Sequence, residues 1–291
     1  MTNKLKILIV GGSGFVGRSL TKAFVQNYQV FSTYHLSYTP MKGAHYLPLP
    51  TLSEKDRCER FIRSIEPDVV IYCLGSNNEV EAEKDSKKTQ NIHSNGVTHL
   101  VHAAEINRAK FIYISSNYIF SGIDGNFGES DSTIPSSTLG NAKAGAESLI
   151  RTRSLNHLII RCAPLLGRGT LDHPSWLDHI REKIIHSHKV EMASRTIHNP
   201  VHISFLAKVI EKAVHEDLRN QNLHVGGLTR ISDYELTKLF VKKIGLSPDQ
   251  VKMSDENSHS APSDYSLNFT ETLKSIEAKP LFLEQSFDLL E

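Results

Sequence analysis

The sequence predicts an α/β fold in which a doubly wound parallel sheet carries a smaller C-terminal α/β lobe. An apolar run at residues 5–10 opens directly into a glycine-rich loop, and strand and helix patterns then alternate through the first half of the chain. Parallel neighbouring strands need a crossover connection, so repeated strand-helix-strand units indicate helices on both faces of one sheet. From Gly167 onward the regular alternation of strand and helix patterns changes, which indicates the second lobe.

The loop after the first strand has the glycine spacing that a dinucleotide's pyrophosphate requires. Gly11 allows a sharp turn, Gly14 lets bare backbone approach the phosphates, and Gly17 lets the next helix lie close to the sheet. We expect these glycines, with Phe15 and Val16, to hold the pyrophosphate at the N-terminus of that helix. A purely structural turn is the alternative, and the strand-loop-helix context favours a Rossmann-type nucleotide site.

The other elements of the first half follow in order. Ser53 is expected to cap a helix that Pro67 ends. The apolar run at 69–74 lacks alternation, as is typical of a parallel strand covered on both faces. Further strands are expected at 28–33, 111–114 and 158–162, and further helices at 85–107 and 143–153. The ligand is expected at the carboxyl ends of the strands, where the glycine loop also lies.

The second half has a different pattern. Helices are expected at 174–188 and 204–215, a short strand at 223–227, and a loop at 254–263. Ser232 and Glu235 form a capping-box pattern that opens a helix, which Gly245 closes. We expect a nucleotide-binding domain over residues 1–165 and a smaller substrate-binding lobe over residues 166–291, with some elements, such as a helix after residue 204, crossing between them.

Composition excludes several classes of partner. Basic and acidic side chains nearly cancel, 33 against 32, so neither nucleic acid nor an anionic membrane is an expected partner. No apolar run approaches the roughly 18 residues of a membrane span, so a cytoplasmic protein is expected. The three cysteines are expected to be free thiols in a reducing compartment. The histidine pairs lack recognisable ligand spacing, so no metal site is expected.

Several independent markers then occur in the order found in one known superfamily. They are the glycine loop, Asn91, the segments at 114–122 and 140–147, Glu129-Ser130-Asp131 with Pro135, and Arg161. Together they resemble the extended short-chain dehydrogenase/reductases and, within these, the dTDP-4-dehydrorhamnose reductase group. The likeness runs from Lys4 to about Gly245.

The resemblance implies a set of catalytic positions. In that family a Ser or Thr, a Tyr and a Lys couple proton transfer to hydride transfer from a nicotinamide. The resemblance implies that Ser116 orients the substrate oxygen and that Lys143 reaches the nicotinamide ribose. The tyrosine position, four residues before the lysine, is Leu139. Leucine has no proton to donate, and a positioned general acid contributes about 10²–10⁴ in rate, so impaired or altered chemistry is expected.

Structural interpretations of the matching residues stay open at this point. Lys143 could be a surface lysine in the first turn of a helix, and Ser116 could simply end a strand. Tyr113 and Tyr118 are other proton donors by residue type, although packing is the better interpretation of Tyr118. A further interpretation is a hydrolase that uses Ser116 with a histidine, and it is supported only by the types of residue present.

The resemblance also bears on the cofactor and on the function as a whole. Leu74 and Gly75 would line the adenosine side of NAD or NADP. The sequence does not distinguish between the two cofactors, because Thr33-Tyr34-His35 offers neither an acid for the ribose nor an Arg for a 2′-phosphate.

The leading hypothesis for the function is an NAD(P)-dependent reductase-like protein that acts on a nucleotide sugar's keto group. The alternative is a dinucleotide-binding regulatory or assembly protein without turnover, as the resemblance to the β subunit of methionine adenosyltransferase implies. The resemblance to that family also suggests a homodimer.

Overall fold

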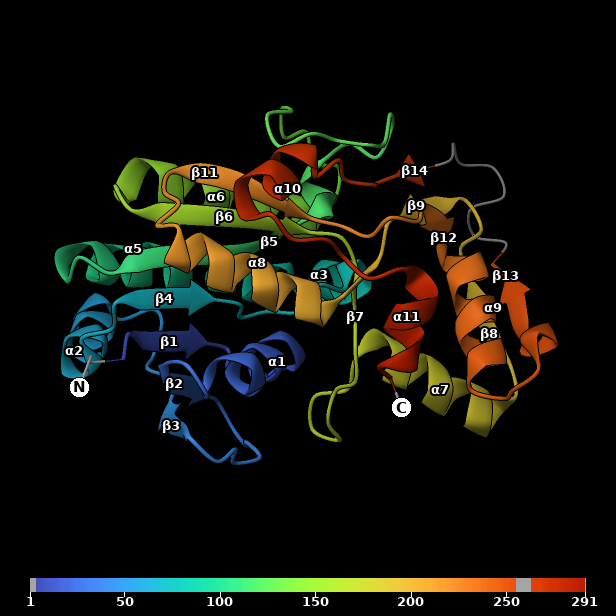
Figure 1. Cartoon of the computed structure of the whole chain (residues 1–291), viewed down its shortest axis with the longest axis horizontal. Helices are drawn as coiled ribbons and strands as arrows, with labels where there is room; N and C mark the ends of the chain where they lie inside the picture. Colours follow the sequence, from blue (N-terminus) through green and yellow to red (C-terminus); the bar gives the residue numbers. More distant parts are fainter. Residues whose placement is uncertain (1–3, 255–262, 291) are drawn as a thin grey trace.

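The computed structural model describes residues 4–254 and 263–290, and a seven-stranded parallel sheet lies at its centre (Figure 1). The strand order is β11-β6-β5-β4-β1-β2-β3, and every adjacent pair is parallel. The predicted doubly wound α/β fold is therefore confirmed. The strands are β1 (Lys6–Val10), β2 (Gln29–Tyr34), β3 (Ala44–Pro48), β4 (Val69–Tyr72), β5 (Lys110–Ser116), β6 (His157–Cys162) and β11 (Gln221–Val225).

Helices cover both faces of this sheet because each central strand is apolar on both sides. In β1, Ile7 and Ile9 belong to one core cluster and Leu8 and Val10 to the other. The first cluster is covered by α1 (Phe15–Phe24), α8 (Ile203–His215) and α10 (Thr270–Ile276). The second is covered by α2 (Lys55–Ile65), α5 (Val97–Ile106) and α6 (Thr138–Arg153).

The long helix predicted over 85–107 is present but is interrupted. It consists of α4 (Ser86–Asn91), a π-helical turn at Ile92–Gly96, and α5, and the shorter α3 (Glu79–Lys84) precedes it. The hydroxyl of Tyr72 donates a hydrogen bond of 2.6 Å to the carbonyl of Ile92, where the π turn begins. A π turn often marks a functional position in a helix.

Two local predictions need correction, and one strand was not predicted. Strand β3 was not predicted, since its run contains His45 and Pro48 and resembles a loop. Ser53 does not cap α2, whose N-cap is Glu54 with no side-chain hydrogen bond. Helix α6 begins at Thr138 rather than at residue 143, because the Ser137 hydroxyl caps it by accepting from the Gly140 N–H.

The smaller lobe lies at one end of the sheet (Figure 1). Its core is formed by α7 (Trp176–Ser187), α9 (Asp233–Lys243) and α11 (Leu283–Asp288). The predicted capping box of Ser232 and Glu235 is confirmed at the start of α9. The short strands and turns are β7 (Leu165–Leu166), β8 (Val190–Met192), β9 (Thr196–His198), β10 (Val201–His202), β12 (Ile231–Ser232), β13 (Val251–Met253), β14 (Ser263–Asp264), and the 3₁₀ turns Asn117–Ile119 and Pro248–Gln250.

The chain passes between the two parts more than once. Strand β11, predicted as an element of the second half, pairs with β6 at the edge of the central sheet, and α8 packs on α1. Most of the loop predicted at 254–263 lies outside the described residues. No helix in residues 4–254 and 263–290 is long and apolar enough to cross a membrane.

Candidate functional site

The glycine loop leaves β1 with its backbone anchored to β2. Gly11 adopts φ +91°, and its N–H donates to the Thr33 hydroxyl at 2.9 Å. The Ser13 N–H donates to the Thr33 carbonyl at 3.0 Å. Helix α1 then starts at Phe15, with Gly14 as an N-cap that has no side chain to satisfy the first N–H groups. Two hydrogen bonds to one residue of β2 thus hold the loop at the carboxyl end of the sheet.

Space around the glycines differs from one to the next. A Cβ at Gly17 would lie 2.2 Å from the Gly11 carbonyl oxygen, and one at Gly12 would lie 2.5 Å from the Ser32 Cβ, so both positions are closed by backbone packing. A Cβ at Gly14 would meet nothing nearer than 3.4 Å. Gly14 therefore keeps one side of the loop open although no packing contact demands a glycine there.

The N-terminus of α1 provides donors for an anion. Its first turn contains no acidic residue, and the Arg18 N–H is bonded to the Gly14 carbonyl at 2.8 Å. The N–H groups of Phe15, Val16 and Gly17 come before that bond, so they have no place in the intrahelical ladder. Unpaired N–H groups and the positive end of the helix dipole suit a phosphate group, so this geometry fits the diphosphate of a dinucleotide.

The structure brings the end of β4 next to this loop. A Cβ at Gly11 would lie 3.0 Å from the Leu74 backbone, so the two predicted site segments are in contact. Gly75 adopts φ +105°, and a Cβ there would lie 3.1 Å from the His93 Nε2. Leu74 and Gly75 thus lie between the glycine loop and the π turn.

Lys143 and Ser116 both lie at the carboxyl end of β5. The Lys143 Nζ donates to the Ile114 carbonyl at 3.3 Å, and the side chain is 6% exposed. The interpretation of Lys143 as a surface lysine is therefore wrong, because α6 begins earlier than predicted. The Ser116 hydroxyl is buried, donates to the Asn117 Oδ1 at 3.4 Å and accepts from the Tyr118 N–H at 3.2 Å.

The surroundings of the lysine are unusual for an ammonium group. Burial lowers the pKa of Lys143 to about 8, although the thiols of Cys162 and Cys73 and the carboxylate of Glu147 oppose that shift. Burial raises the pKa of both thiols to about 12. Leu139, one turn earlier on α6, is 1% exposed. The lysine thus lies near two thiols and a carboxylate. An aliphatic side chain holds the position that the resemblance gives to a tyrosine.

A buried histidine in this region was not predicted from the sequence. The His93 Nδ1 lies 2.8 Å from the hydroxyl of Tyr113, and burial, with the charge of Lys143, lowers the pKa of His93 to about 3. His93 precedes Val97 and Leu100 by four and seven residues, so it falls on the apolar stripe of the predicted helix, and that spacing was the available signal. This hydrogen bond occupies the Tyr113 hydroxyl, which is one of the two tyrosine hydroxyls considered above as alternative proton donors.

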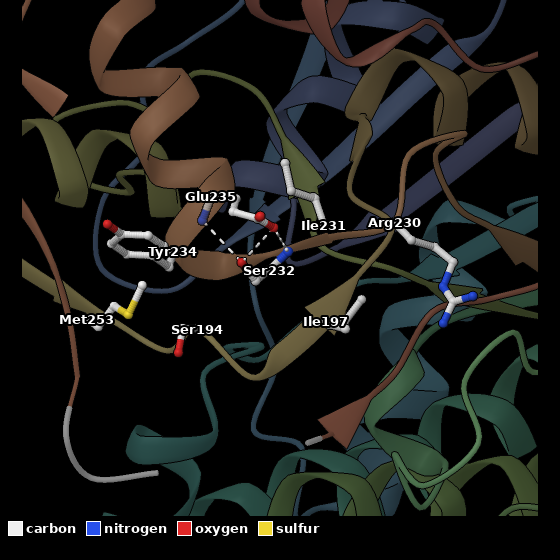
Figure 2. Close-up of a pocket in the computed structure, with 8 residues that line it drawn as sticks. All are labelled: Ser194, Ile197, Arg230, Ile231, Ser232, Tyr234, Glu235 and Met253. Atoms are coloured by element: carbon white, nitrogen blue, oxygen red, sulfur yellow. Dashed lines mark hydrogen bonds between the residues drawn. The ribbon is translucent and has the colours of Figure 1, made fainter. Parts of the chain in front are cut away.

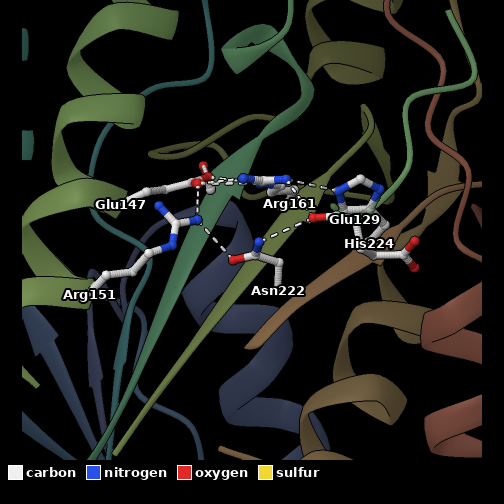
Figure 3. Close-up of polar contacts among 7 residues, drawn as sticks. Glu129, Glu147, Arg151, Arg161, Asn222 and His224 are labelled. Carbon is white, nitrogen blue, oxygen red and sulfur yellow. Dashed lines mark hydrogen bonds and ion pairs between the residues drawn. The ribbon is translucent and has the colours of Figure 1, made fainter. Parts of the chain in front are cut away.

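Glu147 and Arg161 form a buried ion pair that fixes α6 against the sheet (Figure 3). The Arg161 Nη2 donates to the Glu147 Oε2 at 2.9 Å, and the Ser115 hydroxyl donates to the Oε1 at 2.6 Å. Burial by itself raises the pKa of Glu147, but these hydrogen bonds and the Arg161 charge bring it below its ordinary value. Because Glu147 lies one turn after Lys143, the pair sets the position of the lysine.

A second polar chain joins the central domain to the lobe. The Asn117 Nδ2 donates to the His198 Nδ1 at 2.9 Å and to the Tyr265 carbonyl at 3.0 Å. Because its Nδ1 accepts, a neutral His198 carries its proton on Nε2, which lies 4.0 Å from the Asp233 Oδ1. Burial lowers the pKa of His198 to about 4 and, together with Glu79, raises the pKa of Asp233 to about 7. From the sequence, no site role was predicted for Asn117, His198, Asp233 or Tyr265.

The other tyrosine considered as a donor, Tyr118, lies beside this chain. Its ring makes edge contacts with His198 and Tyr265, at centroid distances of 5.7 and 5.2 Å. Burial raises the pKa of Tyr118 well above its ordinary value. The aromatic contacts agree with a packing role for this side chain.

A cavity of about 380 Å³ opens in the lobe (Figure 2). Ser232 and Glu235 line it, held by the capping box of α9, and so does Arg230, whose guanidinium is paired with Asp264. Ile197, the neighbour of His198, lines it too. Its volume lies in the range of small-molecule sites. In the part of the chain that the structure describes, no three His, Cys, Asp or Glu side chains are grouped to hold a metal ion.

Comparisons with known proteins agree with this architecture. The dTDP-4-dehydrorhamnose reductase of Aggregatibacter actinomycetemcomitans is 28% identical over 165 residues, which span 56% of this chain and about half, 52%, of that protein. Methionine adenosyltransferase 2 subunit beta of Rattus norvegicus is 23% identical over 239 residues, 79% of this chain and 70% of that protein.

Solved structures show the same fold. The crystal structure of dTDP-4-dehydrorhamnose reductase from Bacillus anthracis in complex with NADP has a TM-score of 0.85 at 17% identity, covering 99% of this chain and 98% of that one. A hypothetical dTDP-4-dehydrorhamnose reductase from Sulfolobus tokodaii has a TM-score of 0.80 at 26% identity, covering 96% and 98%.

The model of one protein family, described as the RmlD substrate binding domain, matches residues 5–282, and the resemblance stated from the motifs is thereby confirmed. This chain belongs to the RmlD substrate binding domain family.

Proposed function

We propose that this chain binds a nicotinamide dinucleotide on its glycine loop and acts as a reductase-like protein on the keto group of a nucleotide sugar, with altered chemistry. The observation that carries the proposal is the open N-terminus of α1, with Gly14 as its N-cap and three N–H groups ahead of the helical ladder. Relatives whose names or titles include a dTDP-sugar reductase and a bound NADP support the same assignment.

Each segment has a stated task in this proposal. Gly11, Gly14, Phe15, Val16 and Gly17 hold the diphosphate through backbone N–H groups, and the Leu74-Gly75 segment lines the adenosine side. When bound, the nicotinamide supplies hydride to a carbonyl carbon. Lys143 holds the adjoining ribose. Ser116 orients the substrate oxygen after the Ser116 hydroxyl has released its hydrogen bond to the Asn117 Oδ1. The lobe, with its cavity beside Ser232, supplies the substrate side.

The altered chemistry is proposed from the side chain at Leu139. A ketone reduction needs a proton at the oxygen, and a buried aliphatic group cannot donate one. The nearby thiols of Cys73 and Cys162 are weak acids, because burial raises their pKa values to about 12, and they donate to the carbonyls of Val10 and Ile160. The Tyr113 hydroxyl is hydrogen-bonded to His93. We therefore propose slow turnover of the unmodified chain.

A second candidate function is dinucleotide binding without turnover, in a regulatory or assembly protein. Leu139 and the inward hydrogen bonds of Ser116 favour it, because the proton donor is missing and the orienting hydroxyl is engaged. The relationship to methionine adenosyltransferase 2 subunit beta supports it as well. Both candidates need the dinucleotide, whereas turnover separates them.

The dinucleotide site is tested by titrating NADPH and NADH while following cofactor fluorescence. Gly14→Ala is the informative variant, because its Cβ meets no atom nearer than 3.4 Å and yet lies on the open side of the loop. We expect its affinity for the cofactor to fall at least tenfold while its melting temperature stays within a few degrees of the parent chain.

Gly145→Ala is the matched control, since a Cβ at Gly145 in α6 has no neighbour within 4 Å. This variant should bind cofactor as the parent chain does. No fluorescence change of the parent chain at millimolar cofactor would remove the proposed site, and equal binding by Gly14→Ala would move the diphosphate elsewhere.

A further inference from the structure

The lobe holds a second cavity, of about 320 Å³, which the proposed function does not use. It opens at the C-terminal end of α9, where Phe240, Lys243 and Ile244 line it, whereas the cavity beside Ser232 opens at the N-terminal end of that helix. The 11 residues of α9 span roughly 16 Å, and the two cavities share no lining residue among those that the structure describes. This cavity is therefore separate from the proposed substrate side, and its volume lies at the lower end of the range for small-molecule sites.

The floor of the cavity is apolar and comes from three helices that pack together in the lobe (Figure 1). It is lined by Leu177 of α7, Phe240 of α9, Phe287 of α11 and Leu290, which follows α11. These four side chains belong to one core cluster and are between 3% and 5% exposed. The rings of Phe240 and Phe287 lie 6.0 Å apart between centroids, so a flat aromatic group in the cavity has aromatic rings to pack against.

Two guanidinium groups without partners lie at the rim. Arg168, in the loop after β7, and Arg181, on α7, are exposed, and both line the cavity. Within residues 4–254 and 263–290, neither side chain has an ion-pair or hydrogen-bond partner. Lys243, the third cation of the lining, is paired with Asp288. Two cations without a counter-ion at one opening attract an anionic group.

The carboxylate in the lining is already engaged. Among the described lining residues the sole acid is Asp178, whose Oδ2 accepts from the Gly169 N–H at 2.7 Å, from the Ser175 N–H at 2.8 Å and from the Ser175 hydroxyl at 2.7 Å. This oxygen closes the capping box of α7 and joins the loop after β7 to the helix. Because three cationic side chains line the cavity against one carboxylate, the lining carries a net positive charge.

We propose that this cavity binds a small aromatic carboxylate, with its rings on the apolar floor and its carboxylate on Arg181 and Arg168. A guanidinium group presents parallel N–H donors that match the two oxygens of a carboxylate, and such charge-assisted hydrogen bonds are stronger than neutral ones. The floor has no polar side-chain atom to bind a ligand rich in hydroxyl groups. An apolar body that ends in one anionic group therefore matches both parts of the lining.

The test is isothermal titration of the full chain at pH 7 with naphthalene-2-carboxylate and with naphthalene-2-carboxamide, its neutral analogue of the same shape. We expect the carboxylate to bind at least tenfold more tightly than the amide. Arg181→Gln should weaken the carboxylate at least fivefold and change the amide less than twofold. Lys183→Gln is the matched control, because Lys183 is exposed on the same helix and does not line the cavity, so it should change neither affinity more than twofold.

Ile244→Phe tests the apolar part of the site. Ile244 is half-buried at the C-cap of α9 and lines the cavity, so a larger side chain there takes up space that the ligand needs. We expect the affinity for the carboxylate to fall at least tenfold while the melting temperature stays within a few degrees of the parent chain. Equal binding of carboxylate and amide, no binding of the carboxylate, or unchanged affinity in Arg181→Gln or in Ile244→Phe overturns the inference.

NADPH titration distinguishes a separate site from a part of the dinucleotide site. The cavity borders the glycine loop through Gly167, where a Cβ would lie 3.0 Å from the Phe15 ring. We expect the affinity of Arg181→Gln for NADPH to stay within twofold of that of the parent chain, and NADPH and naphthalene-2-carboxylate to bind without competition. Competition between them would place the cavity in the dinucleotide site and overturn the inference. Failure of NADPH to bind, with the carboxylate still bound, contradicts the proposed function and leaves this site in place.

Discussion

At the scale of single residues, this site depends on what each side chain cannot do. Leu139 cannot donate a proton, and Gly14 has no side chain to fill the approach to α1. Both residue types are visible in the sequence. The sequence could not show that Lys143 is buried, because that follows from the early start of α6. The engagement of Ser116 with Asn117 and Tyr118 is equally a property of the folded chain.

Leu139→Tyr tests the missing proton donor. We expect the parent chain to reduce dTDP-4-dehydrorhamnose with NADPH slowly or not at all, and the variant to be faster by about tenfold or more, since a positioned general acid contributes about 10²–10⁴. The measurement is NADPH absorbance at saturating cofactor. A larger side chain in this buried position costs about 1–3 kcal/mol of stability.

Leu139→Phe is the control for that change in volume. It adds a ring of the same size without the hydroxyl, so it should match the tyrosine variant in melting temperature and remain as slow as the parent chain. Fast turnover by the unmodified chain would show that another group protonates the substrate. Equal gains in the two variants would assign the effect to packing.

At the scale of helices and strands, the elements whose apolar residues recur at a regular spacing could be predicted from the sequence. The alternation of strands and helices and the capping box at Ser232 depend on residues close together in the sequence, and the structure contains both. Strand β3 was missed because it lies at the sheet edge, where its side chains are half-exposed and the apolar pattern is weak. The π turn was missed because its cause, the Tyr72 hydroxyl on the Ile92 carbonyl, joins residues twenty positions apart.

Helix α6 depends on the ion pair with β6, and Glu147→Gln tests it. Removing one member of a buried pair leaves the other charged and unsatisfied, which costs about 3–5 kcal/mol at pH 7. The folded pKa of Glu147 lies below its ordinary value of 4.5, so the stabilisation is present above that pH and is lost as the pH falls through the folded pKa. Urea unfolding at pH 7 and pH 4 should show a smaller difference between variant and parent at pH 4.

Glu271→Gln is the control, since Glu271 and Lys274 form an exposed pair in α10. We expect it to change the free energy of unfolding by less than about 0.5 kcal/mol, as exposed pairs contribute little. A Glu147→Gln variant that loses no more than this control would remove the ion pair as the support of α6.

At the scale of the whole molecule, two parts are joined by polar groups that no local pattern reveals. Asn117, His198 and Asp233 come from three distant segments, and only the tertiary fold brings them together. Asn199 adds a second junction, since its Nδ2 donates to the carbonyls of Gly227 and Leu267 at 3.1 and 2.9 Å. Sequence reasoning could place a lobe after the sheet, but it could not find the groups at the junction.

Asp233→Asn tests the electrostatics of this junction. The folded pKa of Asp233, about 7, lies above that of an unfolded aspartate, so protonation favours the folded state. Its contribution is complete below the unfolded pKa near 4 and is lost as the pH rises through 7. His198, with a pKa of about 4, is neutral over pH 5–8, and the Tyr118 phenol stays protonated, so Glu79 is the other group that adds charge there.

We therefore expect the free energy of unfolding of the parent chain to fall relative to that of Asp233→Asn between pH 5 and pH 8, by at most about 1.4 kcal/mol per pH unit. Urea unfolding at four pH values in this range measures the difference. Parallel pH profiles of the two proteins would show that the carboxyl group titrates as it does in the unfolded chain.

The pairing of β11 with β6 has a consequence for synthesis on the ribosome. The edge of β6 is complete at Cys162, but its partner strand ends at Val225, about 60 residues later. At about 5–20 residues per second, the nascent chain exposes unpaired backbone along β6 for roughly 3–12 s. Over that interval the growing polypeptide is open to association with a neighbouring nascent chain, so the rate of elongation between these two strands bears on the yield of native protein.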